Sequence, residues 1–339
     1  MLEFGSGTGE FSVNYLLWDM KADFIELNPL AIKKFKNYVK NFSKSKIYKI
    51  YNKSIFTYKS KKKYDFVSSI GVIHHTNYKE AFKIKSDFVK KNGFMVLGIG
   101  NAAGMFQRNL QRYIIYFLSK KDEKKMYRLT KYLFPEFLKR AQKYGRRTLD
   151  SIIYDNIINP KDNHPSTKEI LALAKKNNLS LYSSWPAVIP TFLSNSAQSH
   201  EVIFKNYDNI LSINDFFSLV HTRDDQIKIN SVNAKISKNI SILNRTTFLI
   251  NNLGSKKLPS LKIVKEAFKG LKKSDLGKIK FLDDYTNLNF INFQKEILIL
   301  TSLLNEGNEK KLRSFIKKTK VLFKGNSGIG MNYYIFHKQ

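Results

Sequence analysis

The residues best placed for chemistry stand at the start of the chain, in residues 2–11 (LEFGSGTGEF). Three glycines, Gly5, Gly7 and Gly9, alternate with small residues directly behind a short apolar stretch that contains the acid Glu3. Glycine has no Cβ atom, so such a loop can turn tightly and let its backbone approach a ligand closely. A glycine loop between a strand and a helix is typical of nucleotide-binding sites in α/β proteins.

The spacing of these glycines disfavours two common phosphate-binding loops. Dinucleotide loops place their glycines two and then three positions apart, whereas this loop keeps a spacing of two and continues with Glu10. No Lys-Ser or Lys-Thr pair follows, as a triphosphate loop requires. A second acid, Glu26, ends the next predicted strand. A carboxylate at that place can accept hydrogen bonds from both ribose hydroxyls of an adenosyl group.

Two further segments strengthen this interpretation. Residues 64–76 read YDFVSSIGVIHHT, and residues 88–94 read FVKKNGF. Together with the alternating glycines and Glu26, they resemble four motifs of class I S-adenosylmethionine-dependent methyltransferases, in the same order and with similar spacing. The first segment resembles the subgroup whose fourth strand ends in Gly-Val-Leu-His-His-Thr. The resemblance covers residues 1–100 and, loosely, about 145–190. It implies a Rossmann-like core and S-adenosyl-L-methionine as the cofactor.

The resemblance also implies roles for individual residues. The glycines would pass under the methionine part of the cofactor, Glu3 would support its ammonium group, and Glu26 would hold the ribose. Leu27 would pack on the adenine, and Ile70 or Gly71 would offer a carbonyl to the ammonium group. The implied cofactor-binding residues are Glu3, Gly5, Gly7, Gly9, Glu26, Leu27, Ser54, Ile55, Ile70 and Gly71.

The chain departs from the family pattern after the third predicted strand. The family often has an aspartate there for the adenine amino group, whereas this chain has Asn52-Lys53-Ser54-Ile55. Ser54 and Ile55 are therefore assigned to the adenine contact by position alone.

Methyl transfer needs a general base only when the acceptor is a weak nucleophile. Histidine titrates near neutral pH and suits that role. We predict His75, at the exit of the fourth strand, as the base, with His74 and Tyr154 as further catalytic candidates. Neither a His-x3-His pattern nor a carboxylate cluster accompanies the histidines, so no metal is expected.

Four further polar residues follow in residues 150–164. Asp150 and His164 are candidate bases for which a scaffolding role is favoured, as it is for Tyr154. Asp155 and Asp162 are expected to lie in solvent.

The elements that must position these residues follow from the hydrophobic pattern. Residues 1–100 alternate short apolar runs with amphipathic segments, which predicts βαβ units and a doubly wound, mostly parallel α/β sheet. Asn28 and Pro29 are predicted to start the helix whose buried stripe is Ile32, Phe35 and Val39. The predicted strands are residues 1–4, 23–27, 46–51, 64–70, 93–99 and 179–185, and the predicted helices of this part are 10–18, 28–39, 81–89 and 166–176.

The sequence predicts four parts. Residues 1–101 form the cofactor-binding core, 102–150 an inserted helical lid, 151–205 the remainder of the core, and 206–339 a mainly helical accessory region. Helices are expected near 213–219, 261–272, 293–304 and 310–323. The seventh strand is either 331–336 or 200–204. The family has a helix and a full strand before the glycine loop, so we expect that a segment before residue 1 is missing.

The predicted lid is basic, with thirteen Lys/Arg and three Asp/Glu between Arg108 and Arg147. Arg108 and Arg112 share a helix face at the i, i+4 spacing and are the predicted substrate contacts. The aromatic residues of the lid are expected to form its own core.

Composition limits the class of protein. The hydrophobic fraction of 42% fits a globular chain. The absence of cysteine excludes disulfides and thiolate chemistry. Neither a membrane span nor a signal peptide is visible, so a cytoplasmic protein is expected. The net charge of +32 comes from lysine spread along the chain, which favours a composition bias over a polyanion partner.

Three functions remain open from the sequence. The first is methyl transfer to a small-molecule, glycan or lipid-precursor acceptor. The second is an RNA methyltransferase that uses the basic lid and tail. The third is a non-catalytic interaction protein that retains the fold. The sequence does not indicate an oligomeric state.

Overall fold

The computed structural model describes residues 1–42, 47–145, 147–188, 284–324 and 330–339, with single positions between 211 and 266. The chain forms two compact units. Unit 1 comprises Met1–Gly100, Lys168–Ala187 and Met331–Gln339, and unit 2 comprises Asn101–Thr167 and Val188–Gly330.

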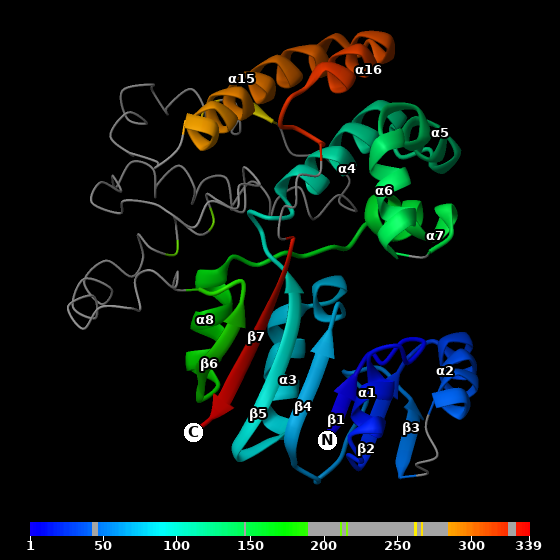
Figure 1. Ribbon diagram of the computed structural model, residues 1–339, viewed down its shortest axis with the longest axis vertical. Coiled ribbons are helices and arrows are strands. Elements are labelled where there is room, and N and C mark those ends of the chain that lie inside the picture. The colour runs from blue at the N-terminus through cyan, green and yellow to red at the C-terminus, as the bar shows by residue number, and fades with distance from the viewer. Residues whose placement is uncertain are drawn as a thin grey trace, which may run out of the picture. The chain divides into compact units, whose positions relative to one another are not determined.

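Unit 1 contains a seven-stranded sheet with the order β3-β2-β1-β4-β5-β7-β6 (Figure 1). The first five strands are parallel, and β7 runs antiparallel to β5 and β6. The predicted doubly wound, mostly parallel α/β fold is confirmed. The strands are β1 (Leu2–Phe4), β2 (Ala22–Glu26), β3 (Tyr48–Asn52), β4 (Tyr64–Ile70), β5 (Val89–Gly100), β6 (Leu179–Trp185) and β7 (Met331–Lys338).

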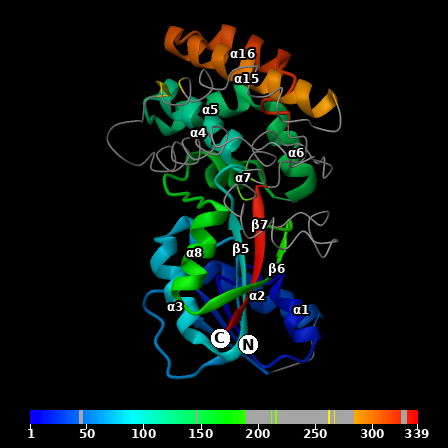
Figure 2. The same cartoon turned by 90° about the vertical axis from the view of Figure 1, so that its left-hand side faces the viewer.

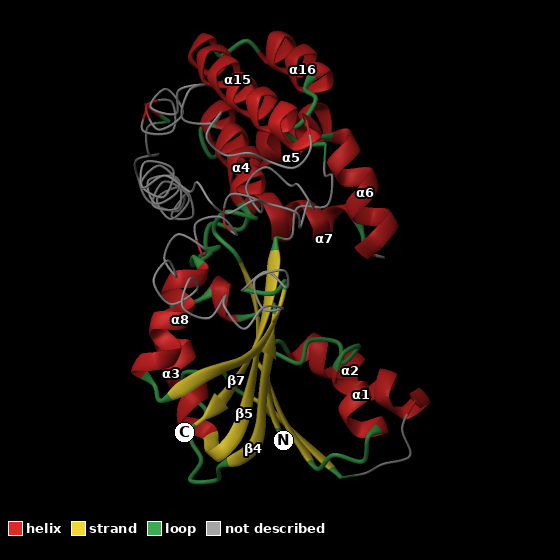
Figure 3. Cartoon of the chain, turned by 60° about the vertical axis from the view of Figure 1, so that its left-hand side comes forward, coloured by secondary structure: helices red, strands yellow, loops and turns green. Residues whose placement is uncertain are grey.

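Helices cover both faces of this sheet. The helices of unit 1 are α1 (Ser12–Leu17), α2 (Pro29–Phe42), α3 (Tyr78–Phe88) and α8 (Thr167–Lys176). Figure 3 shows α1 and α2 on one face and α3 and α8 on the other. The predicted start of α2 is confirmed, since the Asn28 side chain accepts a hydrogen bond from the Leu30 amide at 2.9 Å.

Aromatic and aliphatic side chains fill the space between α2 and the sheet. Phe24 on β2 and Phe35 on α2 are fully buried, with ring centroids 5.0 Å apart. Val39 is also buried and Ile32 is half-buried, so the predicted stripe of α2 faces the core. This packing fixes the helix that follows Glu26.

Strand β5 begins earlier than predicted, directly after α3. The helix ends at Phe88, and β5 begins at Val89 rather than residue 93. The pairing of Val89 with Tyr64 on β4 extends the strand through the exposed Lys90 and Lys91. A register shift between Tyr64 and Phe66 accommodates the extension.

Unit 2 is helical in its described residues. Its helices are α4 (Phe106–Ser119), α5 (Glu123–Leu133), α6 (Pro135–Gly145), α7 (Leu149–Ile153), α15 (Asp284–Glu306) and α16 (Glu309–Lys318), and Tyr154–Ile158 forms a π-helical turn. Residues from the expected lid, such as Phe106 and Leu110, share one apolar core with Phe293 and Ile297 on α15. Figure 2 shows α15 and α16 side by side. None of the helices in the described ranges has the length and apolar character needed to cross a bilayer.

Some predicted elements of the second half fall beyond this description. The predicted helices 293–304 and 310–323 correspond to α15 and α16, the latter ending at Lys318. The expected helices 213–219 and 261–272 lie outside the described residues apart from single positions, and so does the alternative strand 200–204. The strand at 331–338 is β7.

A buried lysine interrupts the apolar stripe of α3. Lys85 is fully buried beside Ala81 and Phe82 in that stripe, and its Nζ atom has no hydrogen-bond partner among the described residues. Burial lowers the pKa of Lys85 to about 7, because an apolar environment disfavours the ammonium ion.

Replacing Lys85 by methionine should therefore stabilise unit 1 at neutral pH. The folded-state pKa of Lys85 lies below the unfolded value of 10.5, so the unfolded chain binds more protons between these values. The free energy of unfolding then rises with pH across this window. At pH 7 the penalty of the native lysine is about 4 kcal/mol at most.

Denaturant unfolding at pH 7 and pH 10 measures this effect. Lys85→Met should raise the free energy of unfolding at pH 7 and reduce its increase toward pH 10. Lys83→Met, on an exposed position of the same helix, is the matched control. Equal pH dependence in the two variants would contradict the prediction.

Candidate functional site

The candidate site lies in unit 1, where the strand order changes direction. The chain passes from β1 to β2 and β3 on one side, and β4 and β5 lie on the other side of β1. In open α/β sheets, ligands bind outside the carboxyl ends of the strands at such a point. The glycine loop follows β1, Glu26 ends β2, and Gly71 follows β4. The topology therefore places these three segments at one edge of the sheet.

The glycines at this edge serve two different purposes. All of them have positive φ angles, which favour glycine: +75° at Gly5, +56° at Gly7, +91° at Gly9 and +74° at Gly71. A Cβ atom at Gly5 would lie 2.3 Å from Val72, and one at Gly9 would lie 2.7 Å from the Phe35 ring. Glycine is required at these two positions because the neighbouring side chains leave no room for a Cβ atom.

Gly7 and Gly71 instead border open space. A Cβ atom at either position would meet no described heavy atom within 4 Å. A backbone without side chains beside open space is what close approach to a ligand needs.

Backbone amides from the glycine loop and from the residues after β2 hold the Glu26 carboxylate in place. One carboxylate oxygen accepts a hydrogen bond from the Gly7 amide at 2.9 Å, and the other accepts one from the Asn28 amide at 2.8 Å. The Asn52 side chain donates to the carbonyls of Glu26 and Leu27, at 3.1 and 2.8 Å. The carboxylate thus has a fixed position beside the open space at Gly7.

The predicted adenine contacts lie next to Glu26 in sequence and in the sheet. Leu27 is 67% exposed, which leaves an apolar side chain uncovered beyond the end of β2. Ser54 follows β3 and accepts a hydrogen bond from the Phe56 amide at 3.2 Å. Ile55 is buried. The adenine role of these three residues stays a prediction.

Glu3 lies below the loop on strand β1. Its carboxyl is buried and accepts a hydrogen bond of 2.5 Å from the Ser12 hydroxyl. Burial raises the pKa of Glu3 to about 7, the Ser12 hydrogen bond lowers it, and the negative charge of Glu26 raises it further. Beside them, the Tyr15 hydroxyl and the Ser68 hydroxyl form a hydrogen bond of 3.0 Å.

The residues that support this arrangement lie outside the predicted set. Ser12, Val72 and Asn52 were not predicted as site residues, although each holds a predicted one in place. A buried acid on a strand needs a donor nearby, and Ser12 is the polar residue that starts the next helix. That signal could have identified Ser12, whereas the contact between Gly5 and Val72 depends on tertiary packing.

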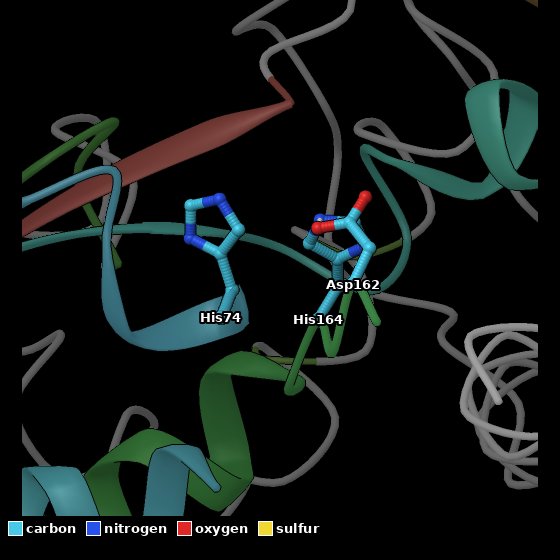
Figure 4. A group of neighbouring side chains, drawn as sticks. All are labelled: His74, Asp162 and His164. Atoms are coloured by element: carbon cyan, nitrogen blue, oxygen red, sulfur yellow. Dashed lines mark ion pairs between the residues drawn. The ribbon is translucent and has the colours of Figure 1, made fainter. Parts of the chain in front are cut away.

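The two candidate histidines lie in a short 3-10 turn, Ile73–His75, that follows Gly71. His74, drawn in Figure 4, is buried, and His75 is half-exposed. Their ring centroids are 4.1 Å apart. The structure places both histidines shortly after the end of β4, as predicted. Their catalytic role stays a prediction.

Other predicted residues lie in unit 2. Tyr154 is half-exposed and donates a hydrogen bond to the Glu123 carboxylate. Asp150 accepts a hydrogen bond from the Tyr127 hydroxyl. Both contacts are internal to unit 2, and the catalytic role of Tyr154 is untested by them.

The two predicted substrate arginines also have contacts inside unit 2. Arg108 lies over the Phe137 ring, 5.8 Å from its centroid. Arg112 is fully buried and pairs with Asp162 at 3.2 Å. The guanidinium of Arg112 therefore neutralises a buried carboxylate, which breaking the pair would leave unpaired at a large cost in stability.

The expectation that Asp162 lies in solvent is wrong. Asp162 is buried, pairs with Arg112 and lies 2.9 Å from the Nε2 atom of His164 (Figure 4). Burial lowers the pKa of His164, while Asp162 opposes that change. The Asn109 side chain lies 3.3 Å from the other ring nitrogen of His164. Arg112, which is distant in sequence, and the neighbouring His164 explain why Asp162 is inside.

Comparisons with known proteins give distant structural likenesses only. No protein-family model matches the chain, and no curated protein matches its sequence. PKMT2 from Rickettsia typhi in complex with AdoHcy has a TM-score of 0.46 and 16% identity, over 66% of this chain and 46% of that chain. A methyltransferase from Clostridium acetobutylicum, S-adenosylmethionine-dependent, has a TM-score of 0.28 and 17% identity, over 31% of this chain and 44% of that chain.

The N-methyltransferase NodS from Bradyrhizobium japonicum, solved with S-adenosyl-L-homocysteine, has a TM-score of 0.27 and 18% identity, over 30% of this chain and 53% of that chain. The chain thus spans less than half of PKMT2 and about half of the other two. Each is a likeness of structure, at 16–18% sequence identity.

Substituting the loop glycines should separate packing from ligand access. Alanine at a positive φ costs roughly 1–2 kcal/mol, and only Gly5→Ala and Gly9→Ala also force a Cβ atom within 3 Å of a side chain. Thermal unfolding should therefore show larger decreases in Tm for these two variants than for Gly7→Ala. Gly307→Ala, at φ +65° with open space around it, is the control for backbone strain alone. Equal decreases in all three loop variants would contradict the assignment.

Proposed function

We propose that unit 1 binds S-adenosyl-L-methionine at the carboxyl edge of β1, β2 and β4, and that the protein is a methyltransferase. The observation that carries this proposal is the position of Glu26. Its carboxylate is fixed against the Gly7 amide, beside the open space at Gly7. The same edge carries Gly71, where a Cβ atom would also meet no described atom within 4 Å.

The residues present suit the parts of this cofactor. Each oxygen of Glu26 accepts one backbone amide and retains a lone pair for a ribose hydroxyl. The exposed Leu27 offers an apolar surface to an adenine ring. Glu3 provides a carboxyl two residues before the loop, suited to support a cationic ammonium group.

In this reaction the protein binds and orients the cofactor, and the reactive methyl group belongs to the cofactor. The cofactor supplies an activated methyl group when it is bound. The residues of unit 1 bind and orient it, and orientation contributes a large part of the rate in a displacement reaction. We assign His75, the more exposed histidine of the turn after β4, to accept a proton from the acceptor where one must be removed.

The acceptor is proposed as a small molecule, glycan or lipid precursor, as the sequence suggests. An RNA acceptor and a non-catalytic role are the alternatives. Arg112, one of the two arginines assigned to the acceptor, is engaged with Asp162, which leaves Arg108 as the better candidate for acceptor binding.

The cofactor assignment is tested by Glu26→Gln. The variant keeps the size of the side chain but removes its charge and one acceptor oxygen, so S-adenosylhomocysteine should bind at least about tenfold more weakly. Isothermal titration calorimetry of the full chain measures this change. Glu10→Gln, on an exposed acid of the same loop, is the control and should leave the affinity unchanged. Absence of binding to the wild-type chain would refute the proposal.

The acceptor class is tested by salt dependence. An RNA enzyme with the charge of this chain should bind tRNA or ribosomal RNA with an affinity that falls steeply as salt rises. An enzyme for small acceptors should bind RNA weakly at 200 mM salt. Fluorescence anisotropy with labelled tRNA between 50 and 200 mM salt measures the slope. Tight binding at 200 mM salt would favour the RNA alternative.

A further inference from the structure

Glu3 and its neighbours form a buried polar cluster beneath the glycine loop. Glu3 lies on β1 between Phe24 of β2 and Ser68 of β4, and its side chain is almost completely shielded from water. The Ser12 hydroxyl, on α1, donates to its carboxyl at 2.5 Å. Ser12 is itself fully buried. Since α1 follows the loop directly, the loop is bounded at both ends by this hydrogen-bonded pair.

Among the residues that the structure describes, the groups that face this carboxyl do not include a cation. Tyr15 on α1 is near enough for Glu3 to contribute to the raised pKa of its hydroxyl, whose main cause is burial. From the end of β2, Glu26 adds a second negative charge. From β4, Ser68 contributes an uncharged hydroxyl, bonded to Tyr15. Within the described part of the chain, only the Ser12 hydrogen bond favours the ionised form of Glu3.

We propose that Ser12 and Glu3 act as a positioning pair that couples cofactor binding to proton release: Ser12 holds the buried carboxyl, and Glu3 loses its proton to solvent when the ammonium group of the ligand binds at the loop. The O–H bond of the carboxyl breaks, the proton goes to water or buffer, and the carboxylate remains to balance the ligand charge. This inference rests on the proposed cofactor site. It assigns Ser12 a role in cofactor binding.

The reason is electrostatic. A positive charge near a buried carboxyl favours its ionised form and lowers its pKa. The pKa of Glu3 in the ligand-free chain is raised to about 7, mainly by burial, so about half of the Glu3 side chains carry a proton at pH 7. Linkage then requires that ligand affinity rise with pH until Glu3 is ionised before binding. With this pKa, the gain between pH 6 and pH 8 is about tenfold.

Calorimetry measures the proton directly. The full chain is titrated with S-adenosylhomocysteine at pH 6, 7 and 8, each in two buffers that differ in ionisation enthalpy. The difference in heat gives the number of protons released. The amino group of the ligand can also exchange a proton on binding, so Glu3→Gln measures the ligand's own share. That variant keeps the shape of the side chain and an acceptor for Ser12.

We expect the wild-type chain to release about half a proton more than Glu3→Gln at pH 7. Its affinity should also rise about tenfold more between pH 6 and pH 8. Ser12→Ala removes the hydrogen bond that lowers the pKa of Glu3, so it should move the midpoint of proton release to higher pH. Glu10→Gln, at an exposed acid of the same loop, should behave as the wild type.

Carbon-13 NMR of the glutamate carboxyls gives a second readout in the wild-type chain, should Glu3→Gln fold poorly. The Glu3 signal should titrate near neutral pH without ligand and shift to the ionised position when ligand is added at pH 6.5. Equal proton release by the wild type and Glu3→Gln, or a Glu3 signal that is already ionised at pH 6 without ligand, would overturn this inference alone. Failure of the wild-type chain to bind the ligand at every pH would overturn the proposed function and this inference with it.

Discussion

The hydrogen bond between the Gly7 amide and the Glu26 carboxylate connects the ends of β1 and β2, two of the three strands that form the candidate site. One partner lies in the loop after β1 and the other at the last residue of β2. Gly7 donates this bond from a backbone with a positive φ angle. The Asn28 amide holds the same carboxylate through its other oxygen. Both partners are at the strand-order switch, and this contact joins the loop to the β2 end together with the hydrogen bond of 2.7 Å from the Gly5 amide to the Ile25 carbonyl.

Packing behind the loop makes that contact possible. Gly5 lies against Val72 from the turn after β4, and Gly9 lies against Phe35 from α2. The side chains on both sides therefore define the path of the loop, and the segment between them projects its backbone at Gly7. The alternation of glycines reflects two requirements, close packing at the first and third and free space at the second.

The sequence predicted the elements that determine this edge because their signals are local. The start of α2 at Asn28 and Pro29 depends on neighbouring residues, and so does the alternation of apolar runs that predicts β1 to β5. What the sequence could not predict depends on distant partners. The extension of β5 to Val89 requires pairing with β4, and the burial of Asp162 requires Arg112, which lies on another element. No local pattern distinguishes Asp162 from the half-exposed Asp155.

The same limit applies to the site. Its glycines and acids were identified by motif, whereas Ser12, Val72 and Asn52 were not, since each acts by supporting another residue. The role of His75 and of the arginines is still inferred from sequence position. Arg112 shows the difficulty, because its spacing with Arg108 predicts a shared face but the fold buries its guanidinium against Asp162.

Lys85 and Glu3 are both buried ionisable groups of unit 1, but their burial has different consequences because they lie in different places. Lys85 lies within the apolar stripe of α3, with no described partner for its amine, and its neutral form is favoured at the expense of stability. Glu3 is buried to a similar degree but lies two residues before the glycine loop and has a donor in Ser12. Only the second group has a neighbouring place where an incoming cation can reverse the effect of burial. A buried charge near a ligand site can therefore convert a penalty of folding into a dependence of binding on pH, which a charge in the apolar core cannot do.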